Sequence, residues 1–314
     1  MRAEAEVKPD ARLHAFAILV ACLTVALLIA GALVTSNEAG DSVPDWPLSF
    51  GRWLIAPENF RANVRFEYSH RFIAGLVGTA TALLAVLSYF LERRSWVRRL
   101  TLIAFGGVVL QALIGGVRVH FPEYRALIAV PHALVAQSFF GLIVAIAVFT
   151  SRHWTARTKV QPDDGSPPLR KLTLWSICVV LIQLVLGAGF RHGAFGIIPH
   201  IVGAVAVTIL LVTTAILVLA RHSKDGFLAR PARLSLVFLI MQLALGVAAY
   251  LTRLKSAGDV QPLEPMISLT AGHVVLGALT LATVLLLALR CHRALAPQGE
   301  ALTRRAGAEA VGLG

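Results

Sequence analysis

Long apolar stretches separated by short polar ones run through most of the chain. Eight of them are long enough to cross a bilayer as a helix: residues 14–35, 70–91, 100–118, 130–151, 171–190, 198–220, 232–252 and 268–290. A helix needs ~20 apolar residues to cross ~30 Å of hydrocarbon. Because the hydrocarbon holds no water, the backbone must satisfy its own polar groups, which favours helices. The pattern predicts an all-α, polytopic membrane protein with eight transmembrane helices.

Composition agrees with this interpretation. Of the 314 residues, 57% are hydrophobic and 15% are charged, whereas a soluble domain averages about 45–50% apolar and about 25% charged residues. These values exclude an ordinary soluble enzyme, a disordered chain and a secreted disulfide scaffold. The formal net charge of +12 would suit a nucleic-acid partner, but the basic residues lie between apolar runs, so we expect no nucleic acid.

The basic residues also predict the topology. Lys and Arg are concentrated in alternate polar segments, namely the N-terminus, the loops at 92–99, 152–171 and 221–233, and the segment after 289. An excess of Lys and Arg marks the cytoplasmic face of a membrane protein. We therefore expect both termini to be cytoplasmic.

The chain also reads as a duplicated unit. Residues 154–170 form a long polar stretch with Pro, Gly and Ser, which predicts a cytoplasmic linker between residues 1–153 and 171–314. Three odd-numbered spans carry Gln-x-x-x-Gly near the outer face, and every even-numbered span has a His at its outer entrance: Gln111/Gly115, Gln183/Gly187 and Gln242/Gly246, and His70, His132, His200 and His273. This placement predicts two pseudo-repeated four-helix bundles.

Histidines in a helical bundle suit haem iron. A neutral imidazole is a metal ligand, and two helices can present imidazoles to opposite faces of a haem while the bundle supplies an apolar slot. Small residues after each His would let a flat macrocycle approach: Ala74/Gly75, Ala133, Gly203 and Gly277. The alternative is that each His simply lies at the membrane interface, where its polar ring nitrogens meet water. Zinc is disfavoured because no Cys or acid completes a ligand set.

The remaining histidines are interpreted as surface groups. Three of them stand beside arginines at the other ends of even spans, and three have no position that matches the repeat. We expect solvated imidazoles at all six positions: His153, His222 and His292, and His14, His120 and His192.

Several short motifs together resemble the haem A synthase family. The segment Glu67-Tyr68-Ser69-His70-Arg71 resembles that family's Glu-x-x-His-Arg signature. The Pro-Asp-Trp-Pro-Leu loop at 44–48, the Pro-His pair at 131–132 and the two later histidines resemble it as well. The resemblance covers nearly the whole chain and implies a multi-pass protein of the bacterial cytoplasmic (inner) membrane.

The resemblance implies an activity and two haem sites. Haem A synthases oxidise a ring methyl of haem O, at C8, to the formyl group of haem A for terminal oxidase assembly. By resemblance, His70 and His132 flank the substrate haem in the N-terminal half. His200 and His273 would ligate a haem b in the C-terminal half, so that all four histidines are axial ligands of haem iron.

Two charged residues next to His70 are further candidates. On a continuing helix the carboxylate of Glu67 would share the His70 face, where it could relay protons or stabilise a cationic intermediate. Arg71 could bind a haem propionate or pair with Glu67. The alternative for Glu67 is an ordinary loop acid paired with Arg65 or Arg71.

The chain departs from the family pattern in its cysteines. Many members have a Cys pair around the Pro-x-Trp-Pro loop, where this chain has Val43 and Ser49. Cys22, Cys178 and Cys291 all lie in spans or at the inner end. We therefore expect no disulfide relay at the outer face.

The sequence favours the first of three functions. The first is a haem-dependent membrane oxidoreductase, because oxidising an unactivated methyl needs a redox cofactor. The second is a di-haem b electron-transfer protein that leaves its haems unaltered and has no need of Glu67. The third, a transporter, requires broken helices and polar sites at mid-membrane, which the spans lack. The expected partners are haem O, its synthase and the lipid bilayer. The electron donor and a homo-oligomeric state stay open.

Overall fold

The computed structural model describes residues 9–157, 160–255, 257–258 and 262–297. The Lys and Arg of residues 1–8 and 298–314, which contribute to the predicted topology, lie outside the described residues, as does Lys159. The long helices are α1 (Ala11–Ser36), α2 (Val64–Leu91), α3 (Ser95–His120), α4 (Arg125–Phe149), α6 (Leu169–Arg191), α7 (Ile197–His222), α8 (Gly226–Lys255) and α9 (Met266–Ala294).

All eight long helices are apolar and long enough to span a membrane, so the predicted all-α multi-pass architecture is confirmed. Several begin earlier or end later than their apolar runs, because helical hydrogen bonding continues into the polar flanks. The fourth span is the exception. The predicted run 130–151 includes two residues beyond the end of α4, since Thr150 is its C-cap and Ser151 caps α5 (Arg152–Thr155).

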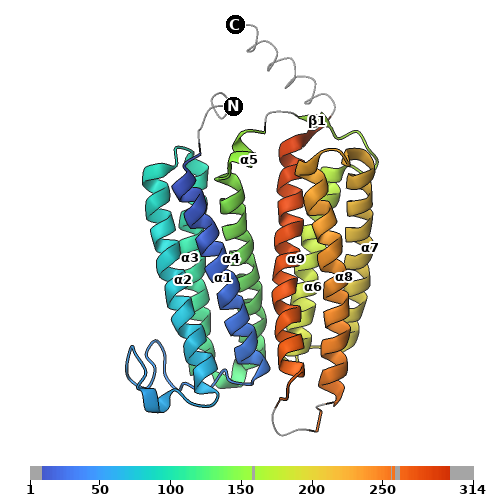
Figure 1. Cartoon of the computed structure of the whole chain (residues 1–314). Helices are drawn as coiled ribbons and strands as arrows, with labels where there is room; N and C mark the ends of the chain where they lie inside the picture. The colour runs from blue at the N-terminus through green and yellow to red at the C-terminus, as the bar shows by residue number, and fades with distance from the viewer. Residues whose placement is uncertain (1–8, 158–159, 256, 259–261, 298–314) are drawn as a thin grey trace.

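The helices form two groups of four that stand side by side (Figure 1). Helices α1 to α4 pack around one another, and α6 to α9 do the same. Helix α9 joins the groups, because it packs against α1 and α4 as well as against α6 and α8. Its many buried residues reflect this central position. Below, α1–α4 are called the first half and α6–α9 the second half.

The linker crosses one end of the molecule, which we call the linker end (Figure 1). Its strand β1 (Gln161–Pro162) pairs in parallel with β2 (Leu295–Ala296), directly after α9. Asp163 accepts hydrogen bonds from the backbone amides of Leu169 and Arg170 and so begins α6. Arg157 forms an ion pair with Asp225, which lies between α7 and α8. The linker is therefore fastened to the second half.

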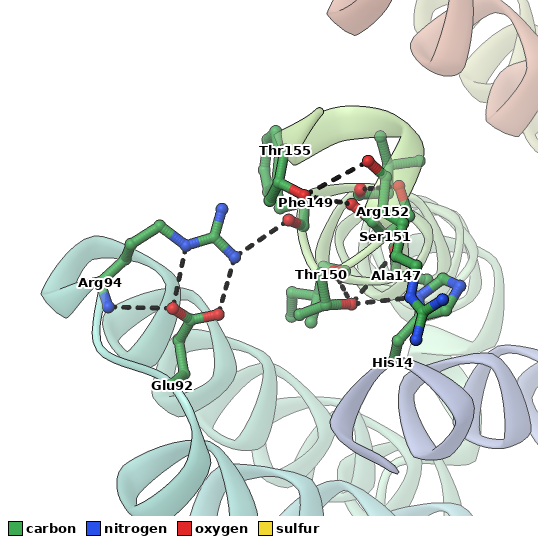
Figure 2. Close-up of polar contacts among 11 residues, drawn as sticks. His14, Glu92, Arg94, Ala147, Phe149, Thr150, Ser151, Arg152 and Thr155 are labelled. Atoms are coloured by element: carbon green, nitrogen blue, oxygen red, sulfur yellow. Dashed lines mark hydrogen bonds and ion pairs between the residues drawn. The ribbon is translucent and has the colours of Figure 1, made fainter. Parts of the chain in front are cut away.

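The first half has its own polar contacts at the linker end (Figure 2). The carboxylate of Glu92, just after α2, accepts hydrogen bonds from the backbone amide and the guanidinium of Arg94. Arg94 also donates to the carbonyl of Phe149, at the end of α4, at 3.0 Å. Nδ1 of His14 lies 3.4 Å from the hydroxyl of Thr150 and ties α1 to α4.

The opposite end, called the loop end, carries the long segment between α1 and α2. It contains the 3-10 helix η1 (Pro57–Asn59) and a tight turn at Phe50 and Gly51, whose φ angles are 54° and 71°. Such angles favour glycine, and Phe50 is held there by Asp45, which accepts hydrogen bonds from both backbone amides of the turn. A second 3-10 helix, η2 (Pro122–Tyr124), joins α3 to α4.

Candidate functional site: a cavity lined by four histidines

One large cavity opens in both halves of the molecule. Its volume is about 1730 Å³, and a drug-sized ligand usually occupies roughly 300–1,000 Å³. Residues from all eight long helices line it, together with part of the loop between α1 and α2. The lining includes every candidate site residue named from the sequence: Glu67, His70, Arg71, His132, His200 and His273.

A glycine of the preceding long helix faces each of these histidine rings. A methyl group built on the glycine would lie within 2.8–3.5 Å of Cε1 of the imidazole in all four cases, so the ring occupies the space that a side chain would fill. The pairs are Gly31 with His70, Gly115 with His132, Gly187 with His200 and Gly246 with His273. The sequence showed three of these glycines within Gln-x-x-x-Gly. Gly31 completes the set, although Leu27 replaces the glutamine there.

The three glutamines bind the histidine helices. Gln111, Gln183 and Gln242 each donate from Nε2 to the backbone carbonyl of the facing histidine at 3.0 Å. In the second half the amides also reach the rings. Nε2 of Gln183 lies 3.0 Å from Nδ1 of His200, and Nε2 of Gln242 lies 3.4 Å from Nε2 of His273. Contacts to a ring nitrogen orient metal-binding imidazoles and tune them.

The two histidines of the second half stand as a pair. The ring centroids of His200 and His273 are 6.2 Å apart and the ring planes cross at 84°. Two metal–nitrogen bonds of about 2 Å, with half a ring at either side, span roughly 6 Å. The two imidazoles therefore have the separation needed to hold one metal ion between them.

Buried ring nitrogens without partners are also consistent with imidazoles that bind a metal. Nδ1 of His70, His132 and His273 has no hydrogen-bond partner within the part of the chain that the structure describes. An unsatisfied buried polar atom is costly and calls for an explanation. Together with the glycines behind the rings, these nitrogens fit a flat ligand that the chain itself does not supply.

Glu67 and Arg71 bind the loop between α1 and α2. Oε1 of Glu67 pairs with Arg71 at 2.6 Å, and its Oε2 accepts from the amides of Ser42 and Val43 at 2.7 and 3.0 Å. Arg71 also donates to three loop carbonyls, those of Val43, Asp45 and Leu48. Of the two partners predicted for Arg71, a haem propionate and Glu67, the structure shows the ion pair with Glu67. Both carboxylate oxygens are occupied in this arrangement.

The loop held by this pair covers the first half of the cavity. Trp46 lines the cavity and packs on Gly116 of α3, where an added methyl would lie 2.6 Å from the indole. Burial alone would raise the pKa of Asp45, but hydrogen bonds from the amides of Gly51 and Phe50 outweigh it and lower the pKa below its usual value. Asp45 is thus ionised at neutral pH and holds the turn of the loop.

The residues at the family's Cys positions are part of the same loop. Val43 and Ser49 are both buried, and the backbone amide of Ser49 donates a hydrogen bond to the carbonyl of Arg52. Cys22, Cys178 and Cys291 are all free thiols. All three lie in helices, in α1, α6 and α9, and none lies in this loop.

Four cationic or titratable residues of the cavity were not predicted. Arg118, Arg191, His192 and Arg253 line it near the loop end. Arg191 links the halves by donating to the hydroxyl of Ser36 at 2.9 Å. Burial, followed by the charges of Arg191 and Arg118, lowers the pKa of His192 to about 4. A rim of guanidinium groups suits carboxylate groups of a ligand.

The interpretation of His192 as a surface group was therefore wrong, because the end of α6 turns its ring toward the cavity. The interpretation holds for His120 and His153, which are exposed. It is wrong for His14 and His292, whose rings are part-buried and hydrogen-bonded to Thr150 and Arg170 respectively. None of the inner-end histidines lines the cavity that holds the four candidate ligands.

Comparisons with known proteins identify similar sequences. A family model described as cytochrome oxidase assembly protein matches residues 14–199. The chain is 30% identical to the heme A synthase of Alkalihalophilus pseudofirmus over 155 residues, which cover 48% of this chain and 51% of that relative. It is 25% identical to the heme A synthase of Halalkalibacterium halodurans over 276 residues, covering 76% and 87% of the two chains.

A third relative, the heme A synthase of Exiguobacterium sp., is 26% identical over 239 residues, which cover 70% of this chain and 77% of that protein. The family model covers more than half of the chain. The chain therefore belongs to the cytochrome oxidase assembly protein family, and its resemblance to the haem A synthases is confirmed.

Proposed function

We propose that this protein is a haem A synthase, a membrane oxidoreductase that converts the C8 methyl of haem O to the formyl group of haem A. The observation that carries the proposal is the pair of imidazoles 6.2 Å apart in a cavity shared with two further histidines. Converting the methyl to a formyl group is a four-electron oxidation in which the carbon loses two hydrogens and gains one oxygen atom, so it needs an oxidant and an oxygen source, water or O₂, besides the protein. The relatives named heme A synthase support this reaction class.

In this proposal the two halves have different tasks. His200 and His273 hold a resident haem b in the half formed by residues 171–314, and this group supplies the one-electron chemistry that side chains lack. His70 and His132 flank haem O in the half formed by residues 1–153. The rim arginines would face the carboxylates of the porphyrins. The lysine and arginine distribution supports cytoplasmic termini and a cytoplasmic linker at 154–170.

Glu67 has a chemical role in the proposal, as a proton relay or as an anion that stabilises positive charge on the substrate. Its contacts favour a second candidate function as well. Since both oxygens are engaged by Arg71 and the loop amides, Glu67 could serve the loop alone. A di-haem electron-transfer protein would need nothing more of it.

The test is expression of the full chain in a host that makes haem O but no haem A. Haems extracted from the membranes are identified by chromatography and mass. We expect haem A with the wild-type chain and none with His132→Ala. The matched control is His120→Ala, since that imidazole is exposed and does not line the cavity. Two unaltered b haems and no haem A would instead support the electron-transfer function.

A further inference from the structure

The cavity reaches deeper in the first half than in the second. In α2 its lining continues from His70 to Leu83, which is about 20 Å along the helix axis. In α1 the lining extends to Phe16, close to the linker end. In the second half the lining of α7 continues from His200 to Ile209 and that of α9 from His273 to Gly277, which are about 14 Å and about 6 Å. The cavity therefore extends further below the histidines of the first half.

Glycines below the histidines show the same difference. A methyl group built on Gly75 or Gly78 of α2 would meet no atom within 4 Å. In the second half, one built on Gly203 would collide with Gln183 and Leu186, and one on Gly277 would lie 3.3 Å from Gln242. The glutamine and leucine side chains thus fill, in the second half, the kind of space that stays open in the first.

The deep part of the first half is apolar and partly open to the membrane. It is lined by side chains of α1 to α4: Phe16, Leu19, Leu23, Leu83, Phe105 and Phe139. Leu19, Leu83 and Phe105 are 48%, 50% and 40% exposed although they line the cavity. A ligand in this space would therefore contact both the bundle and the lipid chains. We call this space, between Gly75 and Phe16, the deep channel.

We propose that the deep channel binds the long isoprenoid side chain by which haem O differs from haem b, and that it selects the tailed porphyrin for the first half. This proposal rests on the proposed function. Continuity with the space at His70 and His132 favours a chain attached to the porphyrin over an unattached lipid. Its membrane opening gives an apolar tail a lateral entry from the bilayer. In the second half, Gln183, Leu186 and Gln242 fill the space directly below the histidines, which favours a haem without a tail there.

Gly78→Leu tests the channel directly. The glycine lies inside α2 and faces open space, so leucine is compatible with the helix and fills only the channel. Purified full-length protein, carrying its resident haem, is titrated with haem O and separately with haem b, and binding is followed by absorbance. We expect haem O to bind about tenfold more weakly, with the affinity for haem b unchanged.

The matched control is Gly106→Leu. Gly106 lies in α3 of the same half, is exposed, meets no atom within 4 Å and does not line the cavity. It should bind both haems as the wild type does. Gly75→Leu provides a second variant within the channel, and retention of the resident haem spectrum shows that each variant is folded.

Four results would overturn the proposal. Unchanged haem O affinity in both channel variants means that the tail lies elsewhere. An equal loss for haem O and haem b means that the substitution acts on the porphyrin. Loss of a co-purified phospholipid with unchanged haem O affinity identifies a lipid as the occupant. A wild-type protein that binds no haem O through His70 and His132 removes the proposed function together with the channel, whereas the first three results leave that function standing.

Discussion

The two halves of this protein use the same parts at the same depth and differ in how tightly those parts are held. Both place a glycine behind each histidine ring. In the second half, glutamine amides also contact the ring nitrogens and fill the space below them. In the first half no glutamine amide contacts a ring nitrogen among the described residues, and the space below His70 is open at Gly75 and Gly78. A restrained site suits a permanent cofactor, and a roomier one suits a ligand that must enter and leave.

The halves also differ at the positions that flank each histidine. Among the residues that the structure describes, only His70 of the four has an ion pair beside it, formed by Glu67 and Arg71. The matching positions around His200 are Ile197 and Ile201, and those around His273 are Thr270 and Val274. The first half can thus carry a loop and the ion pair that holds it, while the second half has the same histidines without either. The difference teaches that the function of each half depends on what surrounds the shared histidines.

Removing one ligand from each half should give the largest effect. His273→Ala should abolish the b-type absorption of the purified protein, because one imidazole of the pair is lost. His132→Ala should keep that absorption and lose haem A formation. Absorption spectra and extracted haems measure the two outcomes. If His132→Ala also abolishes the resident haem spectrum, the assignment of separate tasks to the two halves is wrong.

The ion pair of the first half gives the next largest effect. Glu67→Gln and Arg71→Gln both break it, and breaking a buried pair costs about 3–5 kcal/mol. If Glu67 also acts in chemistry, Glu67→Gln should lose a further 100-fold or so in haem A formation, while haem binding persists and haem O or a hydroxylated product accumulates. Equal losses of haem A formation in the two variants would mean that Glu67 only holds the loop in place. Glu58→Gln, in η1 of the same loop, serves as the control.

Alanine at the glycines behind the rings should produce smaller, graded effects. The added methyl would lie 2.8 Å from His200 for Gly187→Ala and 3.5 Å from His132 for Gly115→Ala. Turning a side chain away from its preferred rotamer costs about 1 kcal/mol, so Gly187→Ala should weaken resident haem binding several-fold. Gly115→Ala should be nearly neutral. Resident haem content per polypeptide measures the effect of Gly187→Ala, and haem O affinity measures that of Gly115→Ala. Equal losses would show that ring clearance does not distinguish the halves.

The sequence predicted the parts of this site that depend on position along a helix. The eight spans follow from apolar length, and the depth of each histidine follows from its distance to the span end. The sequence placed Gln183 and His200 near the same face of the membrane, but their hydrogen bonds became visible only in the structure. The lack of cysteines between residues 36 and 66 can be read directly from the sequence.

The sequence could not show what depends on rotation about a helix axis. In a span that is apolar all round, no polar stripe marks which face turns inward. Arg118 and Arg191 therefore read as ordinary span ends, although both face the cavity. The deep channel depends on whether side chains such as Leu186 fill the space beside a glycine. That is a property of packing in three dimensions, so the unequal depth of the halves appeared only in the structure.

Acid should produce the smallest effect, which we expect in the loop of the first half. Asp45 holds the turn of the loop through the amides of Phe50 and Gly51, and its pKa in the folded protein is below its usual value of 3.8. A lowered folded pKa means that this stabilisation is complete above the usual pKa and is lost as the pH falls through the folded value. Trp46 fluorescence, identified with Trp46→Phe, should stay constant from neutral pH to about pH 4 and change only below it. The resident haem spectrum of the second half should not follow that transition. Asp45→Asn should show the altered fluorescence already at neutral pH, and a transition shared by both halves would mean that acid unfolds the protein as a whole.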